Sequence, residues 1–415
     1  MSSLPLKTLC VVIAAFHLVL GQIGYPHDYP GKPNSDFSPV WQDYFQVTNP
    51  LPNVTFPMSR SWAGNIPVNR PGHPNDTLFF WAVEKETGSL TSTADDSNNE
   101  PWGIWLNGGP GSSSLLGFFT ENGPLHVRSN YSIYANEYSW DHLADHIWVD
   151  QPVGTGFSTV DETGFVADED QMGEDFPYIT KTYFGLENPP VKLTKIAIGD
   201  GTIGNIGEYE VLPAITIIET YPQLIGYDPA VFEYFKEQPM AFLSELATNA
   251  SQHHIGIVIY SGNDDSLVSH MSSEVAIQNT TFGGIQGFTK KPSTPWYDDE
   301  GDFAGIVHQE RNWTYVLVKG AGHLVPQQQP ERAYVLLREF ILGNNQTGLV
   351  TEVTGNISVV GGEDPALAAP ALPGQLGIYV GSATTQSTYT YPSLTIAAWE
   401  SFIATATAIS PRLGH

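Results

Sequence analysis

The sequence predicts an α/β fold with a mostly parallel central sheet. Four apolar runs typical of buried strands lie at residues 102–106, 146–149, 255–260 and 313–318. Each run opens onto a loop that carries an Asn, Asp or His, and sites in open parallel sheets form just beyond the carboxyl ends of strands. A chain of 415 residues can bury such a core without a second domain. We therefore expect the four loops to form one active-site rim.

A hairpin precedes these runs and a helix follows them. Residues 59–67 and 77–84 alternate between apolar and polar side chains, which predicts two antiparallel strands. Pro330 stands where a first helical turn would begin, and apolar residues recur at helical spacing through 333–341. We expect this helix to pack behind the loop that carries His323.

The amino terminus has the pattern of a secretory signal peptide at residues 1–21. Lys7 precedes an uninterrupted apolar stretch, and the small Gly21 marks the expected cleavage point. The stretch is too short to span a membrane. Cys10, the only cysteine, lies within it, so the mature chain would have neither disulfides nor thiol chemistry.

Eight Asn-x-Ser/Thr sequons accompany this signal and favour passage through a glycosylating secretory route. They are Asn53, Asn75, Asn130, Asn249, Asn279, Asn312, Asn345 and Asn356.

The charge balance excludes one class of partner. Asp plus Glu outnumber Lys plus Arg by 44 to 17, which gives a net charge of −27. Such a surface repels nucleic acid and anionic membranes. Because carboxylates lose their mutual repulsion when they are protonated, we expect an extracellular or vacuole-like acidic destination.

Three sequence blocks resemble the serine carboxypeptidase family. Residues 105–113 read Trp-Leu-Asn-Gly-Gly-Pro-Gly-Ser-Ser, residues 150–158 read Asp-Gln-Pro-Val-Gly-Thr-Gly-Phe-Ser, and residues 320–326 read Gly-Ala-Gly-His-Leu-Val-Pro. The blocks are long, specific and in the family's order, and the similarity runs over residues 56–343. The resemblance implies an α/β-hydrolase fold, no cofactor, and cleavage of the last peptide bond of a chain, usually at acid pH.

The resemblance also implies roles for five residues. His323 matches the general base, and Asp265 matches the carboxylate that orients it. The backbone amide of Gly109 matches a donor to the oxyanion that develops on the scissile carbonyl. Asn107 and Glu121 match groups that hydrogen-bond the terminal carboxylate of a peptide or protein substrate. A glutamic acid facing a carboxylate helps only if one of the two holds a proton, which is a physical reason for an acid optimum.

The chain departs from the family at the nucleophile. No Gly-x-Ser-x-Gly elbow occurs, and residues 159–243 contain neither serine nor cysteine. In the family, a helix, a strand and the elbow Gly-Glu-Ser-Tyr-Ala-Gly lie between the counterparts of Phe176 and Pro177. A second shortfall, at Gln238 and Pro239, removes much of the cap. Both junctions are abrupt, as if two blocks had been removed.

The domain organisation follows from these departures. Residues 22–350 form one carboxypeptidase-like α/β-hydrolase domain, with a truncated cap at about residues 206–253. Residues 351–415 form a tail rich in Gly, Ala, Pro, Ser and Thr. Its modest apolar stretch is interrupted by Glu400, so no membrane anchor is expected.

Substitute nucleophiles are weak candidates. Ser112, Ser113 and Ser114 belong to the oxyanion loop, and each would have to attack a carbonyl bound by its own loop. Thr202 follows a strand in Asp-Gly-Thr-Ile-Gly, but Asp200 replaces the first glycine of an elbow, and a β-branched residue fits that strained turn poorly.

No metal site is expected. His142 and His146, with Asp145 between them, have i,i+4 spacing but lack the Glu of a His-Glu-x-x-His motif. His146 begins a buried strand, and the His253 and His254 pair stands at the start of another, so all four histidines are interpreted as structural.

Two hypotheses of function remain. The first is a secreted, glycosylated serine carboxypeptidase whose sequence lost its elbow through a mis-joined gene model or an alternative splice product, and which is inactive as written. The second is a pseudoenzyme that binds peptide carboxyl ends through Asn107 and Glu121.

Overall fold

The computed structural model describes most of the chain between residues 39 and 350. The described residues are 39–68, 70–86, 100–175, 193–204, 241–265, 267–350, 362–364 and 367. The expected signal peptide, the Phe176/Pro177 and Gln238/Pro239 junctions, most of the expected cap and nearly all of the tail lie outside them. No helix within the described ranges is both long and apolar enough to cross a bilayer.

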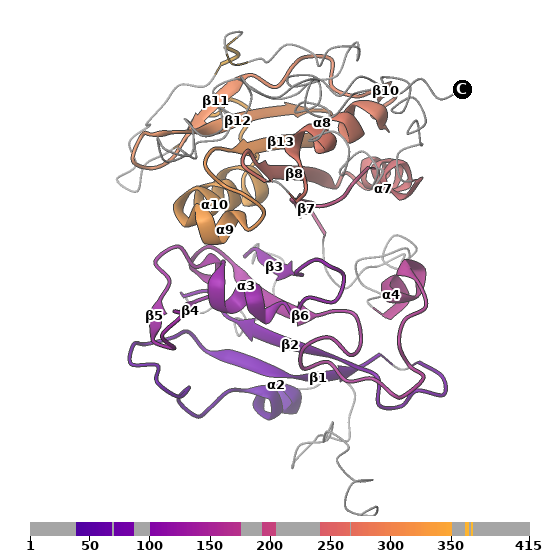
Figure 1. The fold of residues 1–415 in the computed structure, drawn as a ribbon, viewed down its shortest axis with the longest axis vertical. Helices are drawn as coiled ribbons and strands as arrows, with labels where there is room; N and C mark the ends of the chain where they lie inside the picture. Colours follow the sequence, from indigo (N-terminus) through magenta and orange to yellow (C-terminus); the bar gives the residue numbers. More distant parts are fainter. Residues whose placement is uncertain are drawn as a thin grey trace, which may run out of the picture. The chain divides into compact units, whose positions relative to one another are not determined.

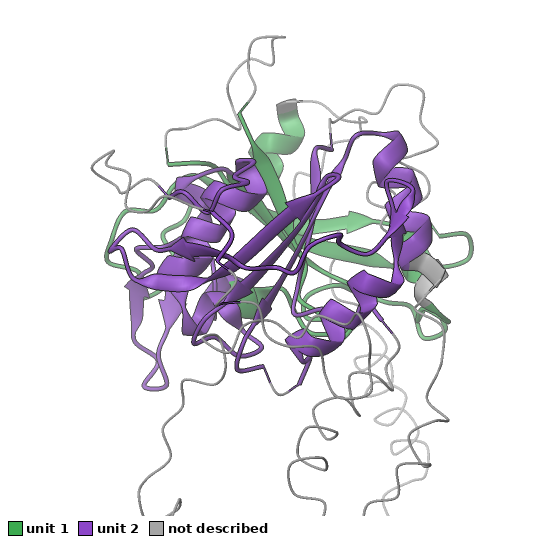
Figure 2. Ribbon diagram, turned by 90° about the horizontal axis from the view of Figure 1, so that it is seen from above, with its two compact units in different colours: residues 1–117, 145–180 green, residues 118–144, 181–415 purple. Residues whose placement is uncertain are grey.

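The chain divides into two compact units, coloured separately in Figure 2. The first unit comprises residues 1–117 and 145–180, and the second comprises residues 118–144 and 181–415.

The first unit contains a four-stranded sheet in the order β1-β2-β6-β3 (Figure 1). Its strands are β1 (Ser61–Pro67), β2 (Thr77–Val83), β3 (Trp102–Trp105) and β6 (Asp145–Asp150). Strands β1 and β2 form the expected antiparallel hairpin, β2 pairs antiparallel with β6, and β3 runs parallel to β6. Among its described residues this unit has the helices α2 (Pro39–Phe45) and α4 (Glu169–Asp175), and α3 (Leu115–Thr120) spans the boundary.

The second unit contains a five-stranded sheet in the order β11-β12-β13-β8-β7. Its strands are β7 (Lys195–Gly199), β8 (Gly256–Gly262), β11 (Thr294–Tyr297), β12 (Phe303–Glu310) and β13 (Trp313–Val318). Strands β7, β8 and β13 are mutually parallel, whereas β11 and β12 add antiparallel pairs at one edge. The helical segments are η1 (Trp140–His142), α7 (Ala241–Gln252), α8 (His270–Asn279), α9 (Val325–Gln328), α10 (Pro330–Leu336) and η4 (Leu337–Leu342). Two small antiparallel pairs complete the unit, β4 (Leu125–Val127) with β5 (Ile133–Ala135), and β9 (Thr281–Phe282) with β10 (Ile285–Gln286).

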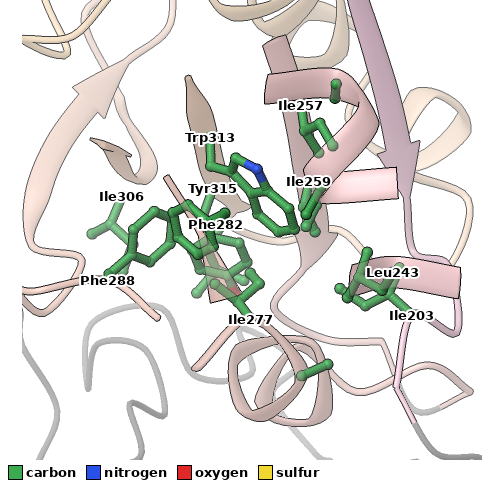
Figure 3. Packing of buried hydrophobic residues seen from close by; sticks show 14 of the residues in the cluster. Ile203, Leu243, Ile257, Ile259, Ile277, Phe282, Phe288, Ile306, Trp313 and Tyr315 are labelled. Carbon is green, nitrogen blue, oxygen red and sulfur yellow. The ribbon is translucent and has the colours of Figure 1, made fainter. Parts of the chain in front are cut away.

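The core of the second unit lies on both faces of its sheet. All six residues of β13 are buried, and alternate side chains point to opposite faces, as the pleat of a strand requires. On one face, Trp313 and Tyr315 pack with residues of α7 and α8 (Figure 3). The rings of Trp313 and Phe282 stack there with centroids 4.3 Å apart. On the other face, Val316 and Val318 pack against α10 and η4. Helices therefore cover both faces of a mixed sheet in which β13, β8 and β7 are parallel, as an α/β-hydrolase fold requires.

The expected helix behind the His323 loop is confirmed. It begins at Pro330 and continues from α10 into a π-helical turn that ends at Leu342. Leu336, Leu337 and Phe340 are buried, so the apolar face read from the sequence is the face that packs against the sheet.

Strands β3 and β7 are each the last strand of their own sheet in the described residues. In the described residues, β3 pairs only with β6, and β7 pairs only with β8. The Phe176/Pro177 junction lies between β6 and β7 in the chain. The four motif-bearing strands are therefore divided between two sheets, with β3 and β6 in one and β8 and β13 in the other.

Candidate active site

The structure brings Asp265 and His323 together. They lie in the loops that follow β8 and β13, which are adjacent and parallel, with Gly262 opposite Val318. The His323 Nδ1 atom is 3.0 Å from the Asp265 Oδ2 atom. This is the contact expected between a general base and its orienting carboxylate.

The Asp265 carboxylate is held in place by its own loop. Its Oδ1 atom accepts hydrogen bonds from the backbone N–H groups of Leu267 and Val268, at 2.8 and 3.0 Å. The Asp265 side chain is almost completely buried, whereas 38% of the His323 side chain is exposed. The pair therefore has a fixed, buried anion behind an accessible imidazole.

The loops that carry Asp265 and His323 are also joined directly to each other. The Asn263 Oδ1 atom accepts the N–H of Gly320 at 2.5 Å, and the Asp264 N–H donates to the Ala321 carbonyl at 2.8 Å. A Cβ atom on Gly262 would lie 2.4 Å from the carbonyl oxygen of Ala321. Only glycine permits this close approach of the loops.

Electrostatics raise the pKa of His323. The hydrogen bond to Asp265 is the largest cause, burial opposes it, and the charges of Asp265 and Glu121 add to the increase. Glu121 follows α3, belongs to the same unit as the pair, and is buried. The second unit therefore holds three of the five residues that the resemblance singled out.

We expect Asp265→Asn to lower the pKa of His323, because the substitution removes the negative charge that stabilises the imidazolium. The titration of the His323 ring protons followed by NMR measures this shift. Asp264→Asn is the matched control and should leave the midpoint unchanged, since the Asp264 side chain accepts the Asn263 amide instead. An unchanged midpoint in Asp265→Asn would refute the coupling. Because the folded pKa of His323 is raised, its contribution to stability is complete below the ordinary imidazole pKa and is lost as the pH rises through the folded value.

Sequence analysis missed a third acidic side chain beside the pair, Asp200. It directly follows β7, is 5% exposed, and has a φ angle of 46°. Its N–H donates to the Tyr260 carbonyl at 2.9 Å, and its Oδ1 atom accepts the N–H of Gly262 at 2.8 Å. The only signal in the sequence was that an Asp directly follows a predicted strand. The segment had drawn interest only because Thr202 within it resembles an elbow nucleophile.

Asn107 and Gly109 lie in the first unit, in the loop after β3. The Asn107 Oδ1 atom accepts hydrogen bonds from the Trp105 indole at 2.7 Å and from the Gly117 N–H at 3.1 Å. Gly109 has a φ angle of 124°, which a residue with a side chain rarely adopts. The loop is thus a tightly fixed turn, and the substrate roles of these two residues remain predictions.

Asp150, at the end of β6, holds two of the motif blocks together. Its carboxylate accepts hydrogen bonds from the Ser113 hydroxyl at 2.7 Å, the Ser114 N–H at 2.8 Å and the Phe157 N–H at 2.9 Å. The Ser114 hydroxyl donates to the Val149 carbonyl at 2.5 Å. Since both hydroxyls serve as structural donors, these serines are poor substitute nucleophiles.

Of the four histidines that were interpreted as structural, His146 lies in a buried, packed position. His146 is buried in β6, and its ring centroid is 5.8 Å from that of Trp148. A Cβ atom on Gly103 would lie 2.8 Å from the His146 Nε2 atom, so the neighbouring strand covers the ring. His253 and His254 are exposed at the end of α7, before β8 begins.

One group of possible metal ligands occurs in the described residues, at His73, Asp76 and Asp161. The Arg70 guanidinium lies 3.1 Å from the Asp76 carboxylate, and both oxygens of Asp161 accept hydrogen bonds from Asn75. The His73 Nδ1 and Asp76 Oδ2 atoms are buried and have no hydrogen-bond partner among the described residues.

Seven of the eight sequons fall on described residues. Asn53, Asn75, Asn130, Asn279 and Asn312 are exposed, whereas Asn249 and Asn345 are partly buried. Asn356 lies outside the described residues.

Comparison with known proteins identifies the family. The serine carboxypeptidase family model matches residues 52–200 and 208–343. A probable serine carboxypeptidase CPVL of Dictyostelium discoideum is 26% identical, with 69% of this chain and 79% of the relative covered. A carboxypeptidase Y homolog of Arthroderma benhamiae is also 26% identical, with 73% and 87% covered. The crystal structure of the prohormone-processing carboxypeptidase Kex1(Δ)p of Saccharomyces cerevisiae is similar with a TM-score of 0.49 and 19% identity, covering 72% of this chain and 94% of that one.

The alignments have long gaps on the side of this chain. The alignment with the Dictyostelium protein extends over 406 positions, although it uses only 69% of this 415-residue chain. A long part of that relative consequently has no counterpart here. The match to the family model nevertheless extends over more than half of the sequence, and the chain belongs to the serine carboxypeptidase family.

Proposed function

We propose that this chain derives from a secreted serine carboxypeptidase, and that the sequence as written is inactive because it lacks the nucleophilic serine. The Asp265–His323 pair carries the proposal. Its 3.0 Å hydrogen bond has the geometry of a working general base. No Gly-x-Ser-x-Gly sequence exists for it to act on.

With an elbow serine restored, each matched residue would have a defined step. His323 would take the serine proton on its Nε2 atom while its Nδ1–H stays on Asp265. The Gly109 amide would stabilise the oxyanion of the tetrahedral intermediate. Asn107 and Glu121 would bind the terminal carboxylate of the substrate, and this restricts cleavage to the last peptide bond. Glu121 must share a proton with that carboxylate, which favours acid pH.

The proposal also includes transport of the protein through the secretory pathway. The amino-terminal apolar stretch, the eight sequons and the net charge of −27 favour a glycosylated protein of the secretory pathway that reaches an acidic compartment or medium. The exposure of five sequon asparagines is compatible with glycan attachment.

We expect genomic DNA at the Phe176/Pro177 junction to encode an in-frame segment containing Gly-Glu-Ser-Tyr-Ala-Gly. The expectation is supported by family-like sequence on both flanks and by the gapped alignments. Sequencing the genomic region together with full-length transcripts tests it. Contiguous codons for Phe176 and Pro177, with no intervening sequence, would reject the mis-joining explanation. They would favour the alternative, a pseudoenzyme that binds peptide carboxyl ends.

A further inference from the structure

A second carboxyl group stands behind the Asp265–His323 pair and has no role in the proposed reaction. Asp200 directly follows β7, the strand that pairs with β8; its Oδ1 atom accepts the N–H of Gly262 at 2.8 Å, and its carboxyl group lies within hydrogen-bonding reach of the Asp265 carboxyl group. Two carboxyl groups can share a hydrogen bond only if one of them carries a proton. We propose that Asp200 is a neutral carboxylic acid that donates this hydrogen bond and thereby positions Asp265 for His323.

The hydrogen bonds around Asp265 identify it as the acceptor. A carboxylate offers about four acceptor positions. Backbone N–H groups of Leu267 and Val268 occupy two of them on Oδ1, and His323 occupies a third on Oδ2. Every one of these partners is a donor, so Asp265 is the ionised member. The O–H group of Asp200 would donate to the remaining acceptor position of the Asp265 carboxylate.

The hydrogen bonds around Asp200 identify it as the donor. Its Oδ1 atom accepts the N–H of Gly262 at 2.8 Å, which leaves the second oxygen to carry the proton. The backbone N–H of Asp200 is fixed by the Tyr260 carbonyl at 2.9 Å, so the side chain starts from an anchored position. Asp is also one of the few residue types that tolerates the left-handed conformation at φ 46°.

The surroundings favour the neutral form. Burial raises the pKa of Asp200 well above its ordinary value, and the charges of Asp265 and Glu121 act in the same direction, whereas the Gly262 N–H opposes them. Tyr260 also faces this group, and its phenol stays neutral because burial raises its pKa. His323, the basic member of the group, is hydrogen-bonded to Asp265.

The neutral acid would have two effects on His323. It fixes the position of the Asp265 carboxylate, and it keeps a second negative charge away from the pair. A second carboxylate would raise the pKa of His323 further and make it a poorer base in acid. The catalytic meaning of this contact rests on the proposed function, whereas none of the measurements below needs turnover, so the two can fail separately.

Two substitutions distinguish the effect of the Asp200 proton from the effect of the hydrogen bond that positions Asp265. Asp200→Asn keeps the shape, because the amide N–H₂ can donate to Asp265 and the amide oxygen can accept from Gly262. Asp200→Gly keeps the backbone conformation, since glycine tolerates positive φ, but removes the donor. Asp264→Asn is the control, a neighbouring acid that does not contact His323 in the described hydrogen bonds.

Three measurements are made on the full chain and its variants. Infrared difference spectra at neutral pH should show the carbonyl stretch of a protonated carboxyl group that is lost in Asp200→Asn and retained in Asp264→Asn. The NMR titration midpoint of His323 should stay unchanged in Asp200→Asn and rise in Asp200→Gly, because Asp265 loses a donor that stabilises its charge. The urea midpoint of Asp200→Asn should exceed that of the parent by a margin that grows as the pH rises.

The sign of the last effect follows from linkage. Below about pH 4, the ordinary carboxyl pKa, Asp200 is protonated in both the folded and the unfolded chain. At higher pH the unfolded chain releases the proton and the folded chain retains it, so the parent loses stability until the pH reaches the folded pKa. Asparagine has no proton to release, so the Asp200→Asn variant does not lose stability in this way. Two results together would show that Asp200 is ionised and overturn the proposal. The difference in urea midpoint between Asp200→Asn and the parent would not vary with pH, and Asp200→Asn would lose no carboxyl band. Equal displacement of the His323 midpoint by both substitutions would overturn the positioning role.

Discussion

The chain as written is expected to release no terminal residue from a blocked dipeptide at acid pH. His323 is oriented by Asp265, but no serine hydroxyl in an elbow is available for it to deprotonate. The hydroxyls of Ser113 and Ser114, which lie in the oxyanion loop, donate to Asp150 and to a backbone carbonyl. Oxyanion stabilisation and binding alone would leave a rate on the order of 10³ to 10⁴ over water, far below that of a complete triad.

The assay has a built-in check on the source of any turnover. Asp265→Ala and His323→Ala are measured beside the parent chain under the same conditions. Activity that survives both substitutions would contradict the triad interpretation as a whole. Activity lost in both would reveal a nucleophile that the sequence does not identify.

The second large effect is expected in folding. A restored form, with a family elbow segment inserted at the Phe176/Pro177 junction, should be secreted better and resist limited proteolysis longer than the chain as written. The inserted strand would pair with β3 and β7, whose outer edges have no strand partner in the described residues. Each buried backbone group left without a partner costs about 1 to 3 kcal/mol. Several such groups would rival the roughly 5 to 15 kcal/mol that separates a folded domain from its unfolded state.

The burial of the two edge strands supports this expectation. Strand β6 is almost entirely buried, whereas the neighbouring β3 has no fully buried residue and exposes Trp102. In the same way β8 is buried and β7 is not. Exposed apolar edges invite pairing with other chains. Thermal unfolding of both forms provides the decisive comparison. A sharp transition of the chain as written, at a temperature similar to that of the restored form, would show that the fold tolerates the loss and would favour the binding hypothesis.

The elements that sequence reasoning predicted are those whose signal is local. The helix that begins at Pro330 was readable because its apolar residues repeat at a single period, and the hairpin of β1 and β2 was readable from alternation. The contact between Asp265 and His323 followed from placing two motif loops after neighbouring parallel strands. The helix and the hairpin are patterns of residues close together in the sequence, whereas the contact joins two short motifs that are far apart in the chain.

The remainder depends on tertiary neighbours. Asp200 followed by glycine has the appearance of an ordinary turn, and only its burial beside Gly262 and Asp265 gives it chemical interest. Asp150 resembled a reactive group at a strand end, but the loops folded around it make it a scaffold. The assignment of the motif-bearing strands to two sheets could not be derived from the motif blocks, because strand pairing depends on residues far apart in the sequence.

The joining of the β8 and β13 loops has a consequence for the history of this lineage. The base and its partner are held by neighbouring strands, by Asn263 and by the close approach at Gly262, all within one unit. None of these contacts involves the absent strand. A lineage with this arrangement can lose its nucleophile while the proton-accepting half of the machinery persists intact. An inserted elbow would then supply a nucleophile to a pair that is already in position, rather than require a new catalytic site.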